Sequence, residues 1–128
     1  MERIIKKSSD YLYFIFRLVV SILFFFHGFN KLNLILAGKM SLFSLMGLAM
    51  ILEIFVGFFV FLGLFTSYFA LLGSFVMVGA WFVAHIPRGW NPFTNGGELA
   101  LLFLVSFLGI ASVGGGKFSL DNYLRRKK

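Results

Sequence analysis

Residues 42–65 read LFSLMGLAMILEIFVGFFVFLGLF, and this stretch decides the class of fold. Glu53 is its only charged residue, and the run is long enough to cross the hydrocarbon core of a bilayer, which takes about 20 residues of helix. Lipid offers no hydrogen-bond partners to backbone amides and carbonyls, so a segment that spans it must be helical. The stretch therefore predicts a transmembrane helix.

Three further stretches share this apolar character, at residues 11–29, 68–85 and 98–113. We expect Thr66 and Ser67 to form a tight turn before the third span, and Pro87 to end that span because it cannot continue the helical hydrogen-bond ladder. Composition agrees: 59% of the 128 residues are hydrophobic and 13% are charged, whereas soluble domains carry about 25% charged residues. We therefore predict one domain over residues 1–128, an all-α polytopic membrane protein that forms a four-helix bundle.

The positive charges mark the ends of the chain. Eight of the 12 Lys and Arg residues lie near the termini, five of them in the basic tail 117–128. The predicted loops carry only Lys31, Lys39 and Arg88. Cytoplasmic segments of membrane proteins are enriched in Lys and Arg, so we expect both termini in the cytoplasm and a multi-pass protein of the plasma membrane. Basic runs that flank apolar spans indicate membrane orientation rather than nucleic-acid binding.

The absence of cysteine restricts the chemistry that the chain can perform. It excludes disulfides, thiol catalysis and iron–sulfur ligation by the chain's own residues. A phosphate-binding loop and a nucleophile motif are also absent, so no catalytic residue and no covalently bound cofactor are predicted.

Arg17 and Glu53 are the charged residues in the interior of the predicted spans. A charge at the bilayer centre costs about 2.5–3.5 kcal/mol on insertion scales, so such residues usually face the bundle and find a partner there. Ala49 and Gly57, four residues either side of Glu53, are small enough to let a neighbouring helix approach. We therefore predict an Arg17–Glu53 pair. It serves a ligand site or only fixes helix packing, and Arg17 could instead extend to the inner interface.

A second set of residues gathers at the predicted outer ends of the spans: His27, Lys31, Trp81, His85 and Glu98. These residues could line a pocket open to the outer leaflet, or they could form an interfacial belt of polar and aromatic anchors. The charge of Glu98 also suits the positive end of a helix dipole. Histidines are ligands for haem and for metals, but these two lie on different helices of unknown rotation, so no metal site is predicted.

The residues after the fourth span predict a turn followed by a short helix. Gly114, Gly115 and Gly116 end the span. Ser119 is then expected to cap the N-terminus of a tail helix, with Asp121 in its first turn, where a negative charge is favourable.

Together these residues resemble the DoxX family of small four-helix membrane proteins, over nearly the whole chain. The resemblance is carried by Arg17, Gly28, Lys31-Leu32, Leu52-Glu53, Gly57, Leu62-Gly63-Leu64, His85, Gly97-Glu98 and Gly114-Gly-Gly-Lys-Phe-Ser-Leu-Asp121. Family members often have Pro in the last motif, where this chain has Gly115. The resemblance implies a membrane partner of redox systems. Some relatives are subunits of a thiosulfate:quinone oxidoreductase, and others associate with thiol-handling and superoxide-handling enzymes.

Our leading hypothesis is an accessory, non-catalytic subunit that presents a pocket for a quinone-like ligand to an oxidoreductase subunit. Arg17 and Glu53 would form its central polar pair, and His85 and Glu98 would contact the head group. A scaffold or folding factor that docks through the basic tail is a second hypothesis. A small proton-coupled carrier is a third, because intramembrane Glu and His often mark ion paths. A carrier of this size would require a homo-oligomer.

Overall fold

The computed structural model describes residues 1–128 and contains helices and no strands, which confirms the all-α class. The longer helices are α1 (Glu2–Leu36), α2 (Leu45–Leu62), α3 (Thr66–Ala80) and α5 (Glu98–Val113). The shorter ones are the π-helix η1 (Trp81–His85), the 3-10 helix η2 (Ile86–Arg88), α4 (Pro92–Asn95) and α6 (Leu120–Arg126). Three continuous helical segments are long and apolar enough to cross a membrane: Glu2–Leu36, Leu45–Leu62 and Thr66–Arg88. The apolar helix α5 is shorter, with 16 residues.

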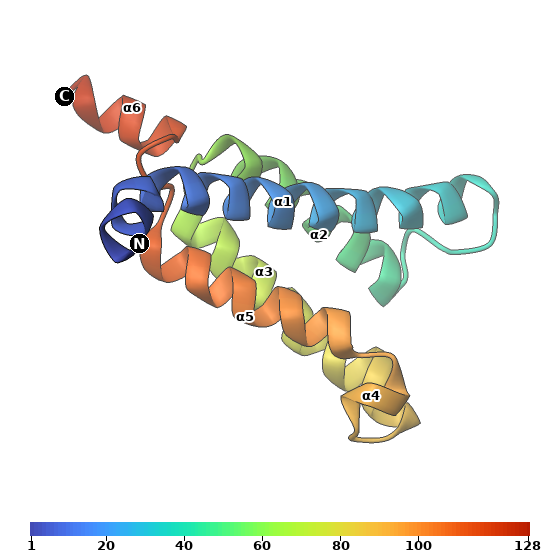
Figure 1. The fold of residues 1–128 in the computed structure, drawn as a ribbon. Helices are drawn as coiled ribbons and strands as arrows, with labels where there is room; N and C mark the ends of the chain where they lie inside the picture. Colours follow the sequence, from blue (N-terminus) through green and yellow to red (C-terminus); the bar gives the residue numbers. More distant parts are fainter.

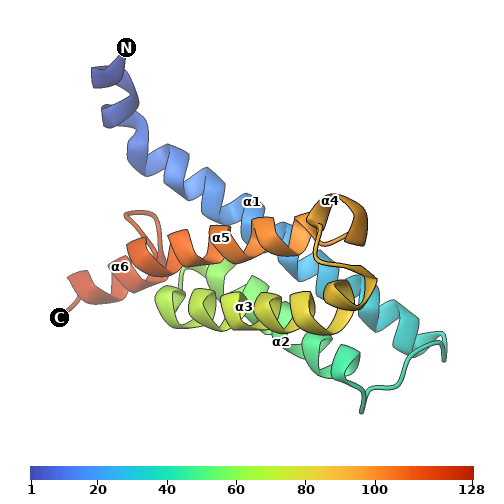
Figure 2. The same ribbon diagram turned by 90° about the horizontal axis from the view of Figure 1, so that it is seen from below.

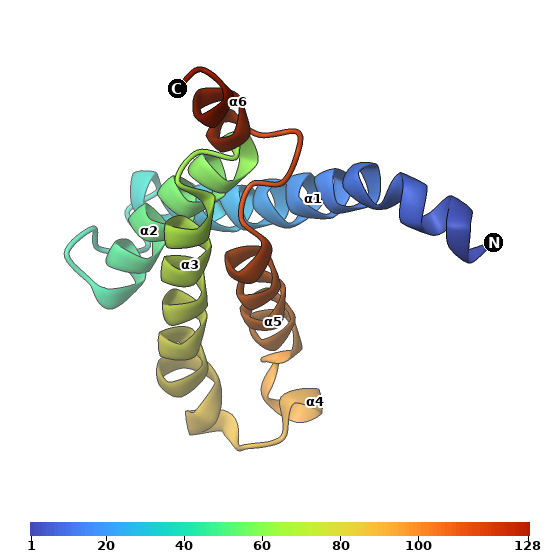
Figure 3. The same cartoon turned by 90° about the vertical axis from the view of Figure 1, so that its left-hand side faces the viewer.

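The helices pair as two hairpins. α1 packs along α2 and α3 packs along α5, and α2 and α3 join the hairpins. Figures 1 and 2 place both termini at one end of the molecule and the α1–α2 loop and α4 at the other. Figure 3 shows α3 and α5 running at a steep angle to α1, so the hairpins lie close at the end of the termini and diverge away from it.

A cluster of aromatic and branched side chains forms the core where the hairpins meet. Phe24 of α1 packs edge-to-face against Phe103 and Phe107 of α5, with ring centroids 5.1 and 4.6 Å apart. Edge-to-face contact brings the positive ring edge of one aromatic to the negative face of the other. α1 and α2 approach closely at Gly57, where a Cβ atom would lie 2.7 Å from the backbone nitrogen of Phe25. The small residue predicted on the Glu53 face of α2 therefore does admit a neighbouring helix.

The outer surface remains apolar. Large side chains such as Phe55, Phe75 and Leu102 are 53%, 66% and 61% exposed. Exposed apolar side chains cover the length of the long helices, which is the surface expected of a protein surrounded by lipid.

The boundaries of α1 and α2 differ from the predicted ones. α1 continues to Leu36, because nothing before Gly38 interrupts the helix and Gly38 adopts the left-handed φ of +69° that ends it. Lys31 is therefore a helical residue and not a loop residue. α2 ends at Leu62, and Gly63, with a φ of +68°, makes the turn that was predicted at Thr66 and Ser67.

The predicted helix at residues 98–113 coincides with α5. The third predicted segment continues as helix beyond α3, first through η1 and then through η2, which contains Pro87. Pi-helical turns inside a helix frequently occur at functional sites, and this one carries His85.

Candidate functional site

Arg17 does not pair with Glu53, so that prediction is wrong. The side chain of Arg17 is buried, with 1% exposure. Its guanidinium donates to the carbonyl oxygens of Val60, of Phe61 at 2.8 Å and of Phe118 at 2.6 Å. The last carbonyls of a helix have no partner within it, and the negative end of the α2 dipole favours a cation there. Arg17 therefore joins α1 to the C-terminal end of α2 and to the tail.

The tail motif closes the same end of the molecule. The carboxylate of Asp121 accepts hydrogen bonds from the backbone N–H of Phe65 at 2.8 Å and from the N–H and hydroxyl of Thr66 at 2.9 and 2.7 Å. Its own backbone N–H donates to the carbonyl of Gly63 at 2.9 Å. Asp121 thus caps the start of α3 as well as lying in the first turn of α6, where Ser119 is the N-cap as predicted. We call this set of contacts the tail clasp.

The turn before α6 brings the clasp into place. Gly114 and Gly116 have φ values of +80° and +74°, which a residue with a Cβ atom rarely adopts. The hydroxyl of Tyr13 donates to the carbonyl of Gly114 and ties the turn to α1. Gly114, Gly116, Ser119 and Asp121 therefore build structure at this end, far from the pocket at the other.

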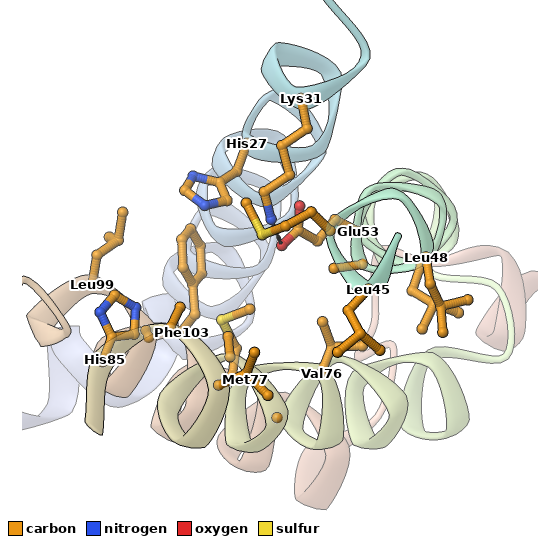
Figure 4. Close-up of a pocket in the computed structure, with 18 of the residues that line it drawn as sticks. His27, Lys31, Leu45, Leu48, Glu53, Val76, Met77, His85, Leu99 and Phe103 are labelled. Carbon is orange, nitrogen blue, oxygen red and sulfur yellow. Dashed lines mark hydrogen bonds and ion pairs between the residues drawn. The ribbon is translucent and has the colours of Figure 1, made fainter. Parts of the chain in front are cut away.

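A pocket of about 370 Å³ lies between the diverging parts of the two hairpins. Figure 4 shows side chains from α1, α2, α3, η1 and α5 converging on it. Most of the lining is apolar, and Leu45, Val83 and Leu99 at its rim are 68%, 58% and 46% exposed. The pocket therefore opens toward the medium around the helices. Its four ionisable lining residues are His27, Lys31, Glu53 and His85.

Lys31 and Glu53 form an ion pair in the wall of this pocket, in which Glu53 is buried and Lys31 is half-buried. The ammonium nitrogen of Lys31 lies 2.6 Å from Oε1 of Glu53, and the side chains are 14% and 1% exposed. Oε2 of Glu53 is buried and has no hydrogen-bond partner. The close crossing of α1 over α2 holds the pair, because a Cβ atom at Gly28 would lie 2.9 Å from the Cβ of Glu53.

His85 stands on the other side of the pocket (Figure 4). Its Nδ1 lies 3.3 Å from the carbonyl oxygen of Asn95. Asn95 is 1% exposed and organises its loop, because its amide donates to the carbonyl of Gly89 at 2.9 Å and its side-chain oxygen accepts from the N–H of Gly97 at 2.8 Å. The loop before α5 thus orients the imidazole and leaves Nε2 free for another partner.

The structure separates the residues that the sequence grouped together. His27, Lys31, His85 and Glu53 line one pocket, whereas Arg17, Trp81 and Glu98 do not line it. Trp81 instead packs beside Gly97, where a Cβ atom would lie 2.4 Å from its ring. Glu98 is exposed at the start of α5. No group of three or more His, Cys, Asp or Glu residues is placed to hold a metal ion.

The sequence pattern placed Met77 in one stripe with His85 on the third span, and Met77 does line the pocket. It did not identify Asn95 or Phe103. Phe103 lines the pocket, and Asn95 orients His85. The N-P-F-T-N stretch carried a turn signal that could have drawn attention to Asn95. Nothing in the sequence distinguishes Phe103 from the apolar residues that face lipid.

Four structural features define the class of protein: apolar helices, an apolar outer surface, charged groups buried between the helices, and a pocket between the hairpins. This is an integral membrane protein with a ligand-sized pocket. The family model for DoxX matches residues 12–86, which is more than half of the chain, and the protein belongs to the DoxX family. No curated protein and no solved structure matches the chain significantly. The matched residues include Arg17, Lys31, Glu53 and His85, whereas the tail motif lies beyond them.

Proposed function

We propose that this DoxX family protein is a non-catalytic membrane subunit that holds a small amphipathic, quinone-like ligand between its hairpins and presents it to a redox partner. The observation that carries the proposal is the apolar pocket with a buried Lys31–Glu53 pair in its wall. An ion pair within the apolar region is costly to bury, so it is expected to serve packing, a ligand, or both.

The dimensions and lining of the pocket suit such a ligand. Small-molecule sites usually measure about 300–1,000 Å³ and combine apolar walls with a few polar groups that fix orientation. Here the walls would accept a ring or the start of an alkyl tail, and Lys31, Glu53 and His27 would contact a polar head group. The exposed rim would let a lipid-soluble molecule enter from the bilayer.

The redox part of the proposal rests on the family. Some DoxX relatives are subunits of a thiosulfate:quinone oxidoreductase, and this chain has no cysteine that could carry electrons itself. A bound quinone would supply the electron-carrying chemistry. The chain's own residues would bind the head group, orient it and shield it from water.

We further propose that α1, α2, α3 with its continuation and α5 all span the plasma membrane, with both termini in the cytoplasm. Both termini lie at one end of the molecule (Figure 1), where eight Lys and Arg residues of the sequence also gather. Enrichment of Lys and Arg at one end of a membrane protein is typical of its cytoplasmic side. The pocket would then lie in the outer half of the membrane.

The first experiment is native mass spectrometry of the protein extracted gently from its own membranes. We expect a bound molecule of quinone size, or a co-purifying oxidoreductase subunit. Gly79 lines the pocket and has nothing within 4 Å of its Cβ position, so Gly79→Leu should fill the pocket and displace the ligand. Gly109 is equally open but lies outside the pocket, so Gly109→Leu is the matched control.

The outcomes separate the hypotheses. A ligand that is lost from Gly79→Leu and retained by Gly109→Leu supports the proposal. A bare protein, or a complex with a partner that has no redox activity, contradicts it and favours a scaffold or folding factor.

A further inference from the structure

We infer that the pocket selects ligands whose head group donates a hydrogen bond, so that among quinone-type ligands it binds the reduced hydroquinone more tightly than the oxidised quinone. The inference rests on the proposed function and adds a preference that the proposal leaves open. It is carried by the two oxygens of Glu53, which have different environments.

Oε1 of Glu53 is satisfied and Oε2 is not. Oε1 lies 2.6 Å from the ammonium of Lys31, whereas Oε2 is buried without a partner. A carboxylate in an ion pair only accepts hydrogen bonds. A buried acceptor without a donor costs free energy, and more so when the group is charged. The vacant acceptor therefore favours any molecule that brings a donor into the pocket.

The surrounding protein supplies no donor for Oε2. The other residues that line the pocket include Ala49, Leu52 and Met77, whose side chains have no polar hydrogen. Among the ionisable residues of the lining, Lys31 is already engaged with Oε1, and neither His27 nor His85 bonds to the carboxylate. Figure 4 shows Lys31 and His27 on α1 above the carboxylate and His85 on the far side.

The carboxylate can present this oxygen to a ligand at low cost. The terminal torsion of a glutamate has a broad energy well, so the carboxylate can rotate and turn Oε2 toward the pocket. The backbone position is set by the close approach of Gly28, so the head of the side chain is the part that adjusts.

The two redox forms of a quinone meet this site differently. A quinone carbonyl only accepts hydrogen bonds, so it could take one from Lys31 but would leave Oε2 unpaired. A hydroquinone hydroxyl donates to Oε2 and can accept from Lys31 through the same oxygen. Because hydrogen bonds to charged groups are the stronger ones and the pocket is apolar, we expect the reduced form to bind at least about tenfold more tightly.

The test is calorimetric titration of the full-length protein in nanodiscs, without oxygen. The probes are a short-chain benzoquinone and the hydroquinone obtained by reducing it, each titrated separately. Tighter binding of the hydroquinone supports the inference. Equal affinities, or tighter binding of the quinone, overturn the inference but leave the proposed function intact. If neither probe binds, both the inference and the proposed function are overturned.

A charge-free variant identifies the acceptor. In Glu53→Gln the amide can donate to a quinone carbonyl, so the preference for the hydroquinone should disappear or reverse. Glu98→Gln makes the same change at a glutamate outside the pocket and should keep the wild-type preference. An undiminished preference in Glu53→Gln overturns the assignment of Oε2 as the acceptor.

A double variant keeps the inference testable if Glu53→Gln does not fold. Glu53→Gln leaves Lys31 without its partner and could unfold the protein. Lys31→Met combined with Glu53→Leu removes both charges together, which proteins often tolerate. We expect this variant to bind both probes with equal affinity. A retained preference there also overturns the inference, and the wild-type titrations decide the matter if no variant folds.

Discussion

Arg17 and Glu53 are both buried charges, and the protein satisfies them in different ways. Arg17 donates to carbonyl oxygens at the end of α2 and in the tail, a role suited to the planar, multi-donor guanidinium. Glu53 pairs with Lys31, which lies one turn beyond His27 on α1. Each residue keeps one buried polar atom without a partner, Nε of Arg17 and Oε2 of Glu53, but only Glu53 lines the pocket. The two residues therefore differ in what they can offer a ligand.

The Lys31–Glu53 pair predicts a strong asymmetry between single and double substitution. Lys31→Met leaves Glu53 buried without a partner, and breaking a buried pair in this way costs about 3–5 kcal/mol of stability. The variant that also carries Glu53→Leu should recover most of this loss. Thermal unfolding in detergent, followed by circular dichroism, measures both. If Lys31→Met is no less stable than the double variant, the pair contributes little to the fold.

Arg17→Lys tests the geometry of the guanidinium. A lysine ammonium carries all its donors on one nitrogen, whereas Arg17 bonds to the end of α2 through one nitrogen and to Phe118 through another. We therefore expect a loss of about 1–3 kcal/mol from unsatisfied buried groups. Arg88 is exposed, and Arg88→Lys should leave the midpoint of thermal unfolding unchanged. Equal midpoints for the two variants would contradict the structural role of Arg17.

At the scale of elements, contacts between distant segments determine where helices begin and how closely they pack. The N-terminus of α3 receives its cap from Asp121 in the tail, 55 residues further along the chain from Thr66. The crossing of α1 and α2 depends on glycines that leave no room for a side chain. Neither feature can be read from the sequence of one helix alone, because each depends on residues in another element.

The tail clasp predicts that Asp121→Ala weakens the start of α3. The substitution removes three hydrogen bonds to Phe65 and Thr66, and loss of an N-cap typically costs about 1 kcal/mol. Asp10 makes only an exposed contact with Lys117 at 3.6 Å, so Asp10→Ala is the control. In Asp121→Ala the midpoint of thermal unfolding should fall and the rate of proteolysis within the tail should rise. Neither should change in Asp10→Ala.

The packing around two glycines predicts that substitution by alanine changes stability in opposite directions at Gly57 of α2 and Gly109 of α5. Gly57→Ala places a Cβ atom 2.7 Å from the backbone nitrogen of Phe25, so α1 and α2 must move apart and stability should fall. Gly109→Ala meets nothing within 4 Å and gains helix propensity, worth up to about 1 kcal/mol. Its unfolding midpoint should rise or stay unchanged. A midpoint for Gly57→Ala at or above that of Gly109→Ala would contradict the close crossing.

For the whole molecule, the angle between the two hairpins creates the pocket. The hairpins are joined at one end by the α2–α3 turn and the tail clasp, and they diverge at the other (Figure 1). The tail clasp and the pocket are therefore at opposite ends, which assigns structural and candidate binding roles to different halves of the protein.

The proposed topology predicts from which side of the membrane a reagent can label each position. The chain has no cysteine, so single substitutions give a clean background for a membrane-impermeant thiol reagent. Ser9→Cys and Lys127→Cys should react only after the membrane is opened, and Lys39→Cys and Thr94→Cys should react in intact cells. All four positions are exposed. Reaction of Ser9→Cys and Lys127→Cys from opposite sides would contradict an even number of spans. Reaction of all four positions from the same side would contradict the proposed spans themselves.

The sequence by itself determined the helical class, the membrane environment, the extent of α5, the capping of α6 and the family. These properties depend on local composition and on neighbours along the chain, because lipid forces apolar segments into helices and a cap needs only adjacent residues. It also placed His27, Lys31 and His85 at comparable depth, because helix length converts residue number into height.

Only the tertiary structure decided which charges meet and what lines the pocket. Lys31 reaches Glu53 because α1 extends past the predicted boundary and crosses α2 at Gly28. Glu98 lies outside the pocket, although it was predicted beside His85. The rotation of each helix about its axis and the angle between hairpins arise from packing of segments far apart in sequence. Residue spacing within a single helix does not constrain either of them.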